Sequence, residues 1–331
     1  MKYPTIKEIA SIAGVSANTV SRALREESGV SQTTQHRIRE IASKIGYERN
    51  VLASHLRTQQ NRTVGVIIID NSNPFYAEVL KGIEAGCKAR GYQILIYNTQ
   101  GDYANEDQAI KLMFSYRVRG IIIDPVPNCG EEHIRLLKER KFPFVLASHY
   151  HRDIETNWVG YDDYQVGNTL GNLLLEKGHR EILFFGGYPG DSTYDDRFAG
   201  FNAALQSHGV KPRPEHVVNF QVDGDTAYRK MKLLLATPRE YTAILAYNDV
   251  AALAAMKAIN EESLRIPHDI AIVGVDNVGM TDLVEPGLTT MHLPKQEAGQ
   301  LAAELLVDCI ENRLPDRRIT LKPNLIVRGS V

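Results

Sequence analysis

The chain has 331 residues, 43% of them hydrophobic and 24% charged, and a formal net charge of −2 at pH 7. This is the composition of a globular protein with room for two or three domains, and no apolar run approaches the ~20 residues of a membrane span. The three cysteines, at 87, 129 and 309, form neither a CxxC pair nor a metal-binding spacing. Because the helical pattern begins at residue 5, we expect no signal peptide. We therefore expect a reduced, cytoplasmic protein.

Charge is unevenly distributed along the chain. Residues 1–60 hold nine Lys and Arg against five Asp and Glu, whereas residues 61–331 hold 29 against 35. A basic N-terminal segment on an acidic body favours phosphate contact by one end of the molecule only.

Two short helices joined by a tight turn are predicted over residues 5–24. Thr5 and Glu8 have the spacing of a capping box, Gly14 supplies a left-handed stop, and Ser16 caps the second helix. The apolar positions recur at helical spacing and predict a buried face made of Ile6, Ile9, Ala10, Ala13, Val20, Ala23 and Leu24. The residues left outside on the second helix are Ala17, Asn18, Ser21 and Arg22. This pattern is typical of a helix-turn-helix that reads a DNA groove.

A third helix is predicted after Ser31, its cap, and ends at Gly46. Its apolar stripe consists of Ile38, Ile41, Ala42 and Ile45. The alternative is an ordinary three-helix bundle with a solvated face, but the Ala-Gly-Val-Ser turn between two capped helices favours DNA binding.

From residue 63 onward, strands and helices alternate. Strands are predicted at 64–70, 92–97, 120–124 and 144–146, with helices near 76–90, 106–116 and 131–140. After a connecting strand at 158–161 and a helix ending at 177, the pattern restarts with strands at 182–185, 217–220, 243–246 and 270–275. Such alternation predicts βαβ units in two α/β lobes, each with a parallel sheet.

Polar residues follow the strands in both lobes. They are Asp70 to Asn73, Asp124, Ser148-His149, Tyr247 to Asp249 and Asp276-Asn277. Any one of them is more often a turn former or helix cap than a ligand contact. Because open α/β sheets bind ligands beyond the carboxyl ends of their strands, two facing rims of this kind favour a small polyhydroxylated ligand in the cleft.

Signals of catalysis are missing from the sequence, which has no GxGxxG after a strand, P-loop, GxSxG or HExxH motif. We expect neither enzyme activity nor a cofactor. His149 and His151 flank Tyr150, yet two histidines without a third ligand are usually a solvated turn, so no metal site is expected. We expect Trp158 in the core rather than stacked on a sugar.

With these patterns in view, the sequence resembles the LacI/GalR family of transcriptional repressors along its whole length. The segments that carry the resemblance are Thr-Ile-Lys-Glu-Ile-Ala (5–10), Ala-Gly-Val-Ser (13–16), Thr-Val-Ser-Arg-Ala-Leu (19–24), Val-Gly-Val-Ile (64–67), Asn-Pro-Phe-Tyr (73–76), Asp-Arg-Phe-Ala-Gly-Phe (196–201), Val-Gly-Val-Asp (273–276) and Leu-Thr-Thr (288–290). The resemblance implies a helical head followed by a periplasmic-binding-protein-like α/β core of two doubly wound lobes. It also implies a homodimer on a pseudo-palindromic operator.

The expected boundaries are a head over 1–48, a hinge helix and linker over 49–62, and an effector-binding and dimerisation core over 63–331. Within the core, we expect lobe one at about 63–160 and 291–318, and lobe two at about 161–290 and 319–331. In the family, the hinge helix forms on DNA and opens the minor groove with a leucine, here Leu56. Two positions depart from the family hinge, Arg49 in place of proline and Ser54 in place of arginine; the alternative is a linker that only tethers the head.

Pattern and resemblance together predict two sets of contacts. The predicted DNA contacts are Thr5, Ser16, Ala17, Asn18, Thr19, Ser21, Arg22, Ser31, Thr34, Tyr47, Asn50, Ala53 and Leu56. The predicted effector contacts are Asn73, Phe75, Asp124, Ser148, Arg197, Asn248 and Asp276. Ser148 and Leu293 stand where aspartate and glutamine are common in the family, so an ordinary monosaccharide is not to be assumed.

The predicted function is repression of transcription under control of a small carbohydrate-type effector. Arg197→Ala and Asp276→Ala should abolish the response to that effector while leaving folding and basal operator binding nearly intact. The alternatives are a catabolite-control regulator with a phosphoprotein corepressor and a purine-responsive repressor. A ligand-binding protein without regulation and a DNA-modifying enzyme fit the sequence less well, because of the head and because no catalytic constellation is present.

Overall fold

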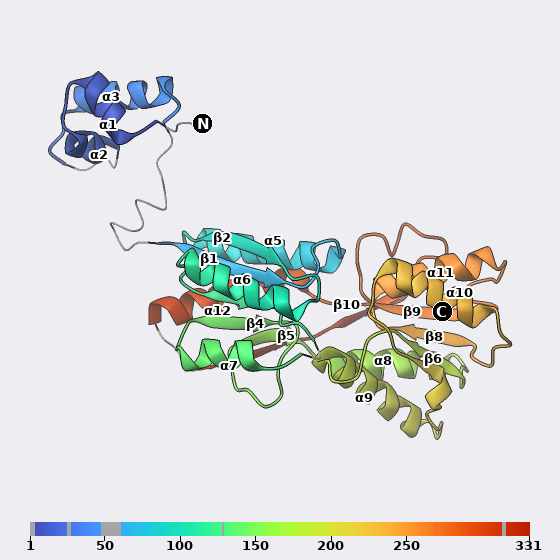
Figure 1. The fold of residues 1–331 in the computed structure, drawn as a ribbon. Helices are drawn as coiled ribbons and strands as arrows, with labels where there is room; N and C mark the ends of the chain where they lie inside the picture. Colours follow the sequence, from blue (N-terminus) through green and yellow to red (C-terminus); the bar gives the residue numbers. More distant parts are fainter. Residues whose placement is uncertain (1–3, 25–27, 48–60, 128, 313–315) are drawn as a thin grey trace. The chain divides into compact units, whose positions relative to one another are not determined.

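The computed structural model describes residues 4–24, 28–47, 61–127, 129–312 and 316–331. Its contacts divide the chain into two compact units, one up to Asn61 and one from Arg62 onward. Figure 1 shows both units with their helices and strands labelled.

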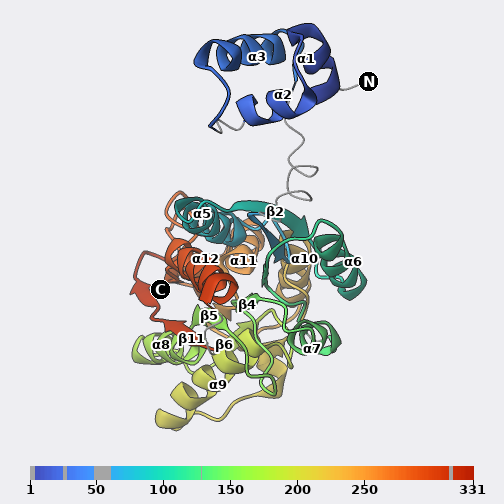
Figure 2. The same cartoon turned by 90° about the vertical axis from the view of Figure 1, so that its left-hand side faces the viewer.

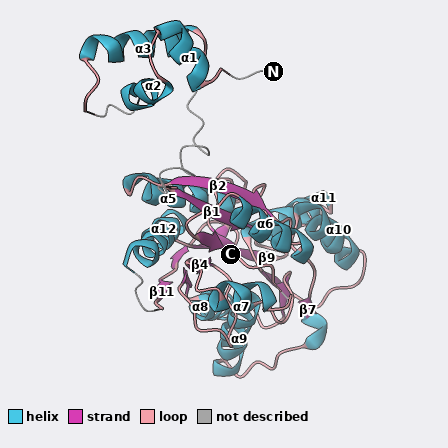
Figure 3. Ribbon diagram, turned by 60° about the vertical axis from the view of Figure 1, so that its left-hand side comes forward, coloured by secondary structure: helices cyan, strands magenta, loops and turns pink. Residues whose placement is uncertain are grey.

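The described part of the first unit consists of helices joined by turns and loops, without a strand (Figure 3). It consists of α1 (Ile6–Ala13), α2 (Ala17–Leu24) and α3 (Gln32–Lys44). The three helices pack around Ile9, Val20, Ala23 and Ile38, whose side chains are completely buried. A core this small is sufficient for a compact head, although it leaves most of the surface of each helix in solvent.

The first lobe of the larger unit is built on an all-parallel six-stranded sheet with the order β11-β5-β4-β3-β1-β2. Its strands are β1 (Thr63–Ile68), β2 (Gln93–Asn98), β3 (Ile121–Ile123), β4 (Phe144–Ala147), β5 (Trp158–Tyr161) and β11 (Arg318–Leu321). Its helices are α5 (Pro74–Ala89), α6 (Tyr103–Ser115), α7 (Glu132–Glu139) and α12 (Lys295–Asn312). Figure 2 shows α5 and α12 on one face of this sheet and α6 and α7 on the other.

The second lobe repeats this plan with the order β12-β10-β9-β8-β6-β7, in which only the edge strand β12 runs antiparallel. Its strands are β6 (Ile182–Phe185), β7 (Val217–Val218), β8 (Ala243–Ala246), β9 (Ala271–Asp276), β10 (Thr289–His292) and β12 (Asn324–Ile326). Its helices are α8 (Asp163–Glu176), α9 (Ser192–Ser207), the 3₁₀ turn η1 (Pro214–His216), α10 (Gly224–Leu235) and α11 (Asp249–Glu261). Helices α8 and α9 cover one face, and α10 and α11 cover the other.

The predicted fold class is therefore confirmed, with local differences. The helix predicted from residue 106 begins at Tyr103, because Asp102 caps it by accepting hydrogen bonds from the amides of Ala104 (2.7 Å) and Asn105 (3.0 Å). The strand predicted at 217–220 shortens to β7, with a single bridge from Phe220 to Gly187.

The chain passes between the lobes three times, after β5, after β10 and after β11. The expected lobe boundaries are displaced by a few residues at two of these passages. All four residues of β11, up to Leu321, pair with β5 in the first lobe, and β10 extends to His292 in the second. A strand belongs to the sheet with which all its residues pair. The expected boundaries at 290 and 318 fall inside β10 and β11, so the observed boundaries lie a few residues later.

Glycines let two helix pairs approach closely. A Cβ at Gly82 of α5 would lie 2.0 Å from the carbonyl oxygen of Gln296 in α12. A Cβ at Gly167 of α8 would lie 1.8 Å from the carbonyl oxygen of Arg197 in α9. The second contact fixes the backbone of Arg197 against α8.

Candidate functional site

The turn between α1 and α2 has the predicted local chemistry. Thr5 and Glu8 form the capping box, with the Glu8 amide donating to Thr5 Oγ1 (3.3 Å) and the Thr5 amide donating to Glu8 Oε2 (2.7 Å). Gly14 is left-handed at φ 65°, and Ser16 Oγ accepts from the Thr19 amide (3.1 Å). These bonds hold α2 as a short, rigid helix with its N-terminus at the surface.

The outer face of α2 differs from the prediction at one position. Ala17 and Asn18 are exposed, but Ser21 is only 6% exposed, so its expected place on the outside was wrong. Ser21 follows the fully buried Val20 and is itself buried in the helical unit. Arg22 is partly exposed, and its guanidinium donates to the Ser28 carbonyl.

The remaining predicted head residues fall into two groups. Ser31 caps α3 by accepting from the Thr34 amide (3.3 Å), and Tyr47 packs half-buried against the head's core. Asn50, Ala53 and Leu56 lie outside the described residues, so the hinge stays a prediction.

Between the lobes lie two adjoining cavities, of about 580 Å³ and about 50 Å³. Both are lined by residues that follow strands of each lobe, as the strand-end argument predicts. The larger is lined by Ile69, Asp70, Asn73, Tyr76, Gln100, Gly101, Pro127, His149, Gly187, Tyr188, Asp191, Phe220, Gln221, Val222, Asp223, Tyr247 and Asn248. The smaller is lined by Asn73, Phe75, Tyr76, Ser148, His149, Tyr161, Asp163, Thr193, Arg197, Tyr247, Asn248 and Asp276.

Six of the seven predicted effector residues line these cavities: Asn73, Phe75, Ser148, Arg197, Asn248 and Asp276. The seventh, Asp124, is 2% exposed and does not line either cavity. It is hydrogen-bonded to two residues that do, His149 and Tyr76. Asn73 and Asn248 use their side-chain oxygens to cap α5 and α11, accepting from Phe75 (3.0 Å) and Ala251 (3.0 Å). Their amide NH₂ groups therefore remain as the donors for a ligand.

Arg197 is held on both sides. Its Nε donates to Asp163 Oδ1 (2.7 Å), one Nη donates to the Tyr247 carbonyl (2.6 Å), and its guanidinium lies 4.9 Å from the centre of the Tyr247 ring. Both charged side chains are almost fully buried, and burial raises the pKa of Asp163 despite the arginine beside it. Arg197 thus compensates a buried carboxylate, and this buried pair leads us to expect a loss of stability when Arg197 is replaced, in contrast to the expectation from sequence.

Asp276 ends β9 and points at the smaller cavity. It is 4% exposed, and its backbone is left-handed at φ 114°, where Lys295 Nζ donates to its carbonyl oxygen. Among the described residues its carboxylate makes no hydrogen bond, and burial together with the nearby Asp249 raises its pKa well above the usual range. This carboxyl group is consequently available to a ligand.

The hydroxyl of Tyr161 is a further polar group that sequence reasoning missed. It is buried at the smaller cavity and has no hydrogen-bond partner among the described residues. A buried polar group without a partner costs stability. Tyr161 ends β5 directly before the chain enters the second lobe, and this strand-end position could have marked it as a site residue in the sequence.

His149, Asp191 and Tyr247 were not predicted as site residues, although His149 and Tyr247 follow strands. His149 lies between Asp124 (Nδ1 to Oδ1, 2.6 Å) and Asp191 (Nε2 to Oδ1, 3.3 Å), so it is not part of a solvated turn. The described residues contain no group of three or more His, Cys, Asp and Glu placed to hold a metal ion. Trp158 is buried as expected, and its Nε1 donates to the Ser148 carbonyl (3.0 Å).

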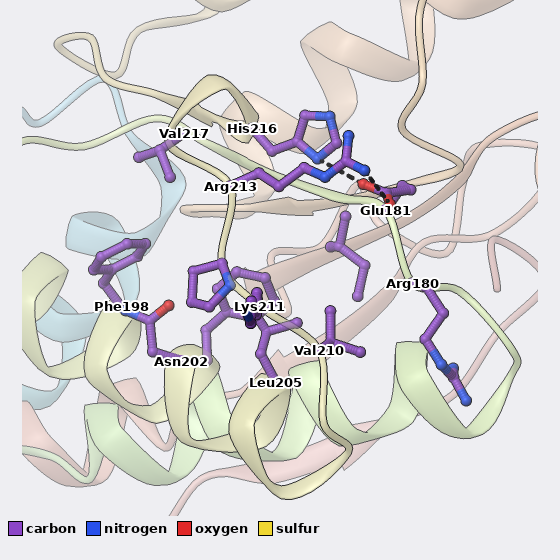
Figure 4. Close-up of a pocket in the computed structure, with 13 residues that line it drawn as sticks. Arg180, Glu181, Phe198, Asn202, Leu205, Val210, Lys211, Arg213, His216 and Val217 are labelled. Atoms are coloured by element: carbon purple, nitrogen blue, oxygen red, sulfur yellow. Dashed lines mark ion pairs between the residues drawn. The ribbon is translucent and has the colours of Figure 1, made fainter.

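A third cavity lies in the second lobe beside α9 (Figure 4). Glu181 pairs there with Arg213 (3.0 Å) and His216 (3.4 Å), and the buried Oδ1 of Asn202 has no partner among the described residues. Its volume of about 20 Å³ accommodates a single water molecule, which excludes it as an effector site.

The head and the body each match a family model. Residues 5–50 match the model described as bacterial regulatory proteins of the lacI family, and residues 172–331 match the periplasmic binding protein-like domain. None of the described helices is long and apolar enough to cross a membrane.

Relatives and solved structures match the whole chain. The HTH-type transcriptional repressor PurR of Aliivibrio salmonicida is 30% identical over 332 residues, covering 99% of this chain and 98% of that protein. A complex of the transcriptional regulator CelR with cellobiose is 25% identical, with a TM-score of 0.76 over 99% of this chain and 100% of the other. The lac repressor dimer bound to operator and the anti-inducer ONPF shares the fold, with a TM-score of 0.86 at 22% identity and 99% coverage of both chains.

A helix-turn-helix head joined to a two-lobed ligand-binding core defines a ligand-responsive transcription regulator. The chain belongs to the LacI family of bacterial regulatory proteins. It is a DNA-binding repressor with an effector-binding domain and not an enzyme.

Proposed function

We propose that this chain is a cytoplasmic homodimeric repressor whose operator affinity is set by a small, uncharged, polyhydroxylated effector bound between the lobes. The observation that carries the effector class is the Tyr161 hydroxyl, which is buried at the smaller cavity without a hydrogen-bond partner among the described residues, together with the Asp276 carboxyl group that lines the same cavity. Sugar hydroxyl groups, which donate and accept, are suited to both, and Phe75 offers an apolar face for a sugar ring.

The charges around the cavities argue against a phosphorylated or carboxylated effector. Five of the lining side chains are acidic, Asp70, Asp163, Asp191, Asp223 and Asp276, although burial raises the pKa of Asp163 and Asp276. The two cationic lining groups, Arg197 and His149, are already paired with carboxylates. An anion would therefore enter a negative cavity without a free cation to receive it.

A purine is the second candidate, because a purine-responsive repressor is the alternative left open by the sequence, and the repressors called PurR match 99% of this chain at up to 30% identity. Tyr76, Tyr161 and Tyr247 give the cavities flat apolar faces as well as hydroxyl groups. A purine could stack on these tyrosine rings, whereas the Asp276 carboxyl group favours a ligand with several hydrogen-bond donors.

A thermal-shift screen of the purified full chain separates these candidates. Neutral sugars, amino sugars, sugar phosphates and purine bases are added at equal concentration. A specific ligand at 100 times its Kd stabilises the folded state by about 2.7 kcal/mol. Stabilisation by neutral sugars alone supports the proposal, stabilisation by amino sugars alone contradicts an uncharged effector, and stabilisation by purines alone replaces the proposal. No stabilisation by any ligand contradicts it and favours a phosphoprotein corepressor.

For DNA, we propose base contacts from Ala17, Asn18 and Arg22 on α2 and a minor-groove wedge at Leu56. A bidentate contact from Arg22 to guanine contributes about 1–3 kcal/mol of discrimination. Arg22→Ala should therefore weaken operator binding at least fivefold more than it weakens binding to random duplex. Equal losses on both duplexes would show that Arg22 contacts only phosphate.

The hinge proposal has a separate test. If Leu56 wedges a base step, the operator is bent in the complex, and Leu56→Ala reduces both bending and affinity. A circular-permutation gel shift that finds straight DNA with the unmutated chain would refute it.

A further inference from the structure

One short segment of the first lobe, Ser148–Arg152, is hydrogen-bonded to the first turns of α9 in the second lobe. The Tyr150 amide donates to Ser192 Oγ (3.0 Å), and the Tyr150 hydroxyl donates to Asp196 Oδ2 (2.8 Å). Arg152 donates to the other oxygen of Asp196 (2.5 Å). These contacts join the two lobes, next to His149 and Asp191, which line the larger cavity.

His149 lies at the centre of this junction. Its Nδ1 is 2.6 Å from Asp124 in its own lobe, and its Nε2 is 3.3 Å from Asp191 in the other lobe. The remaining oxygens of the two carboxylates accept from the hydroxyls of Tyr76 (2.8 Å) and Tyr247 (2.9 Å). Both ring nitrogens of His149 therefore face acceptors, and only the imidazolium has a proton to donate to each.

The surrounding charges favour the same protonation state. Burial by itself would lower the pKa of His149, but Asp124 and Asp191 outweigh it and raise the pKa well above 6.5. Burial likewise opposes ionisation of Asp191, yet His149 and the donated hydrogen bonds bring the pKa of Asp191 below its usual value. The other titratable groups facing this cluster are Tyr76 on α5, Tyr247 after β8, Asp163 on α8 and His151. Arg197 lines the adjoining cavity and is held by Asp163.

We infer that protonated His149 is an interlobe clamp, a positioning residue that holds the lobes in the arrangement seen here. Its imidazolium connects an anionic group of each lobe at the wall of the larger cavity, where an effector reaches His149 and Asp191 directly. The clamp gives the effector a defined means of shifting the lobe equilibrium, since a ligand acts only through different affinity for the two arrangements. This regulatory role rests on the proposed function, although the clamp itself is testable without effector or DNA.

The dependence on pH has a definite sign. Because the folded-state pKa of His149 is raised, the clamp is complete below about 6.5 and is lost as the pH rises through that raised value. Raising the pH should therefore loosen the lobes, whereas acidification to pH 6 should not.

The test measures the distance between spin labels on the two lobes of the full chain. The labels replace the exposed residues Glu139 on α7 and Gln206 on α9, with Cys129→Ser to remove the partly exposed thiol. Variants His149→Gln and Asp191→Asn break the clamp. His151→Gln is the matched control, because His151 lies two residues away and faces Glu131 (3.9 Å) within the first lobe.

The expected result is a narrow distance distribution for the unmutated chain at pH 6 that widens as the pH is raised. His149→Gln and Asp191→Asn should give the wide distribution at every pH, while His151→Gln should follow the unmutated chain. Identical, pH-independent distributions for His149→Gln and the unmutated chain overturn the clamp. A wide distance distribution in the two clamp variants, combined with unchanged operator affinity, would support the clamp but contradict its role in the proposed regulation.

Discussion

Replacing Arg197 with alanine tests whether the cleft's central cation is also a structural element. The substitution removes the bonds to Asp163 and to the Tyr247 carbonyl, and it leaves the Asp163 carboxylate buried at 5% exposure without a counter-charge. Breaking a buried ion pair by removing one partner costs about 3–5 kcal/mol. For a core of this size that corresponds to a fall of roughly 6–20 °C in melting temperature.

The assay is urea unfolding followed by circular dichroism, at a fixed protomer concentration because dimerisation would contribute to stability. The double variant Asp163→Asn/Arg197→Ala should recover part of the loss, since no buried charge remains. Arg265→Ala is the control: its pair with Asp269 (3.0 Å) is solvent-exposed, and the midpoint should not move.

The loss in Arg197→Ala should also depend on pH. Burial already raises the pKa of Asp163 above 3.8, and removing the arginine raises it further. The destabilisation should therefore be small near pH 4, where the carboxyl group is protonated, and grow as the pH rises. A variant as stable as the unmutated chain at pH 8 would refute the reasoning, because it would show that Asp163 needs no counter-charge.

Two further predictions follow from the same region. Asp276→Asn should leave stability unchanged or increase it, because burial and Asp249 disfavour the charged form of this carboxyl group more than Arg197 and Lys295 favour it. The same substitution should weaken effector binding about 10- to 100-fold in calorimetry. A large loss of stability would show that the charge is compensated. Gly167→Ala should lower the free energy of unfolding in urea by about 1–3 kcal/mol, because the added Cβ meets the Arg197 carbonyl. Gly224→Ala is the control and should not destabilise, because nothing lies within 4 Å of its Cβ. Equal effects of the two substitutions would contradict the close packing of α8 on α9.

The features that were predictable from sequence are those decided by neighbouring residues. Thr5, Ser16 and Ser31 cap their helices as expected, because a cap depends only on the three or four residues that follow it. Asn73, Asn248 and Asp276 meet at the cleft because parallel strands end at one edge of each sheet.

The features that were missed depend on contacts between distant segments. His149 gains its role from Asp191, which lies 42 residues further along and in the other lobe, so its own neighbours carry no sign of it. Arg197 matched a family motif, but its buried partner Asp163 is on a different helix, and a motif does not reveal which charge it compensates. Ser21 follows the spacing of exposed positions yet is buried, because tertiary packing decides exposure at the edge of a helix's apolar face.

The most direct test of the account is the affinity of the full chain for its operator with and without effector. The operator is first selected from a random duplex library, and the effector is the compound that stabilises the protein most in the thermal-shift screen. Fluorescence anisotropy is then measured at one fixed salt concentration, since phosphate contacts make affinity salt-dependent. We expect enrichment of a pseudo-palindromic sequence whose affinity for the chain changes about 5- to 150-fold when effector is added. An operator bound equally well with and without a ligand that demonstrably occupies the cleft would contradict it.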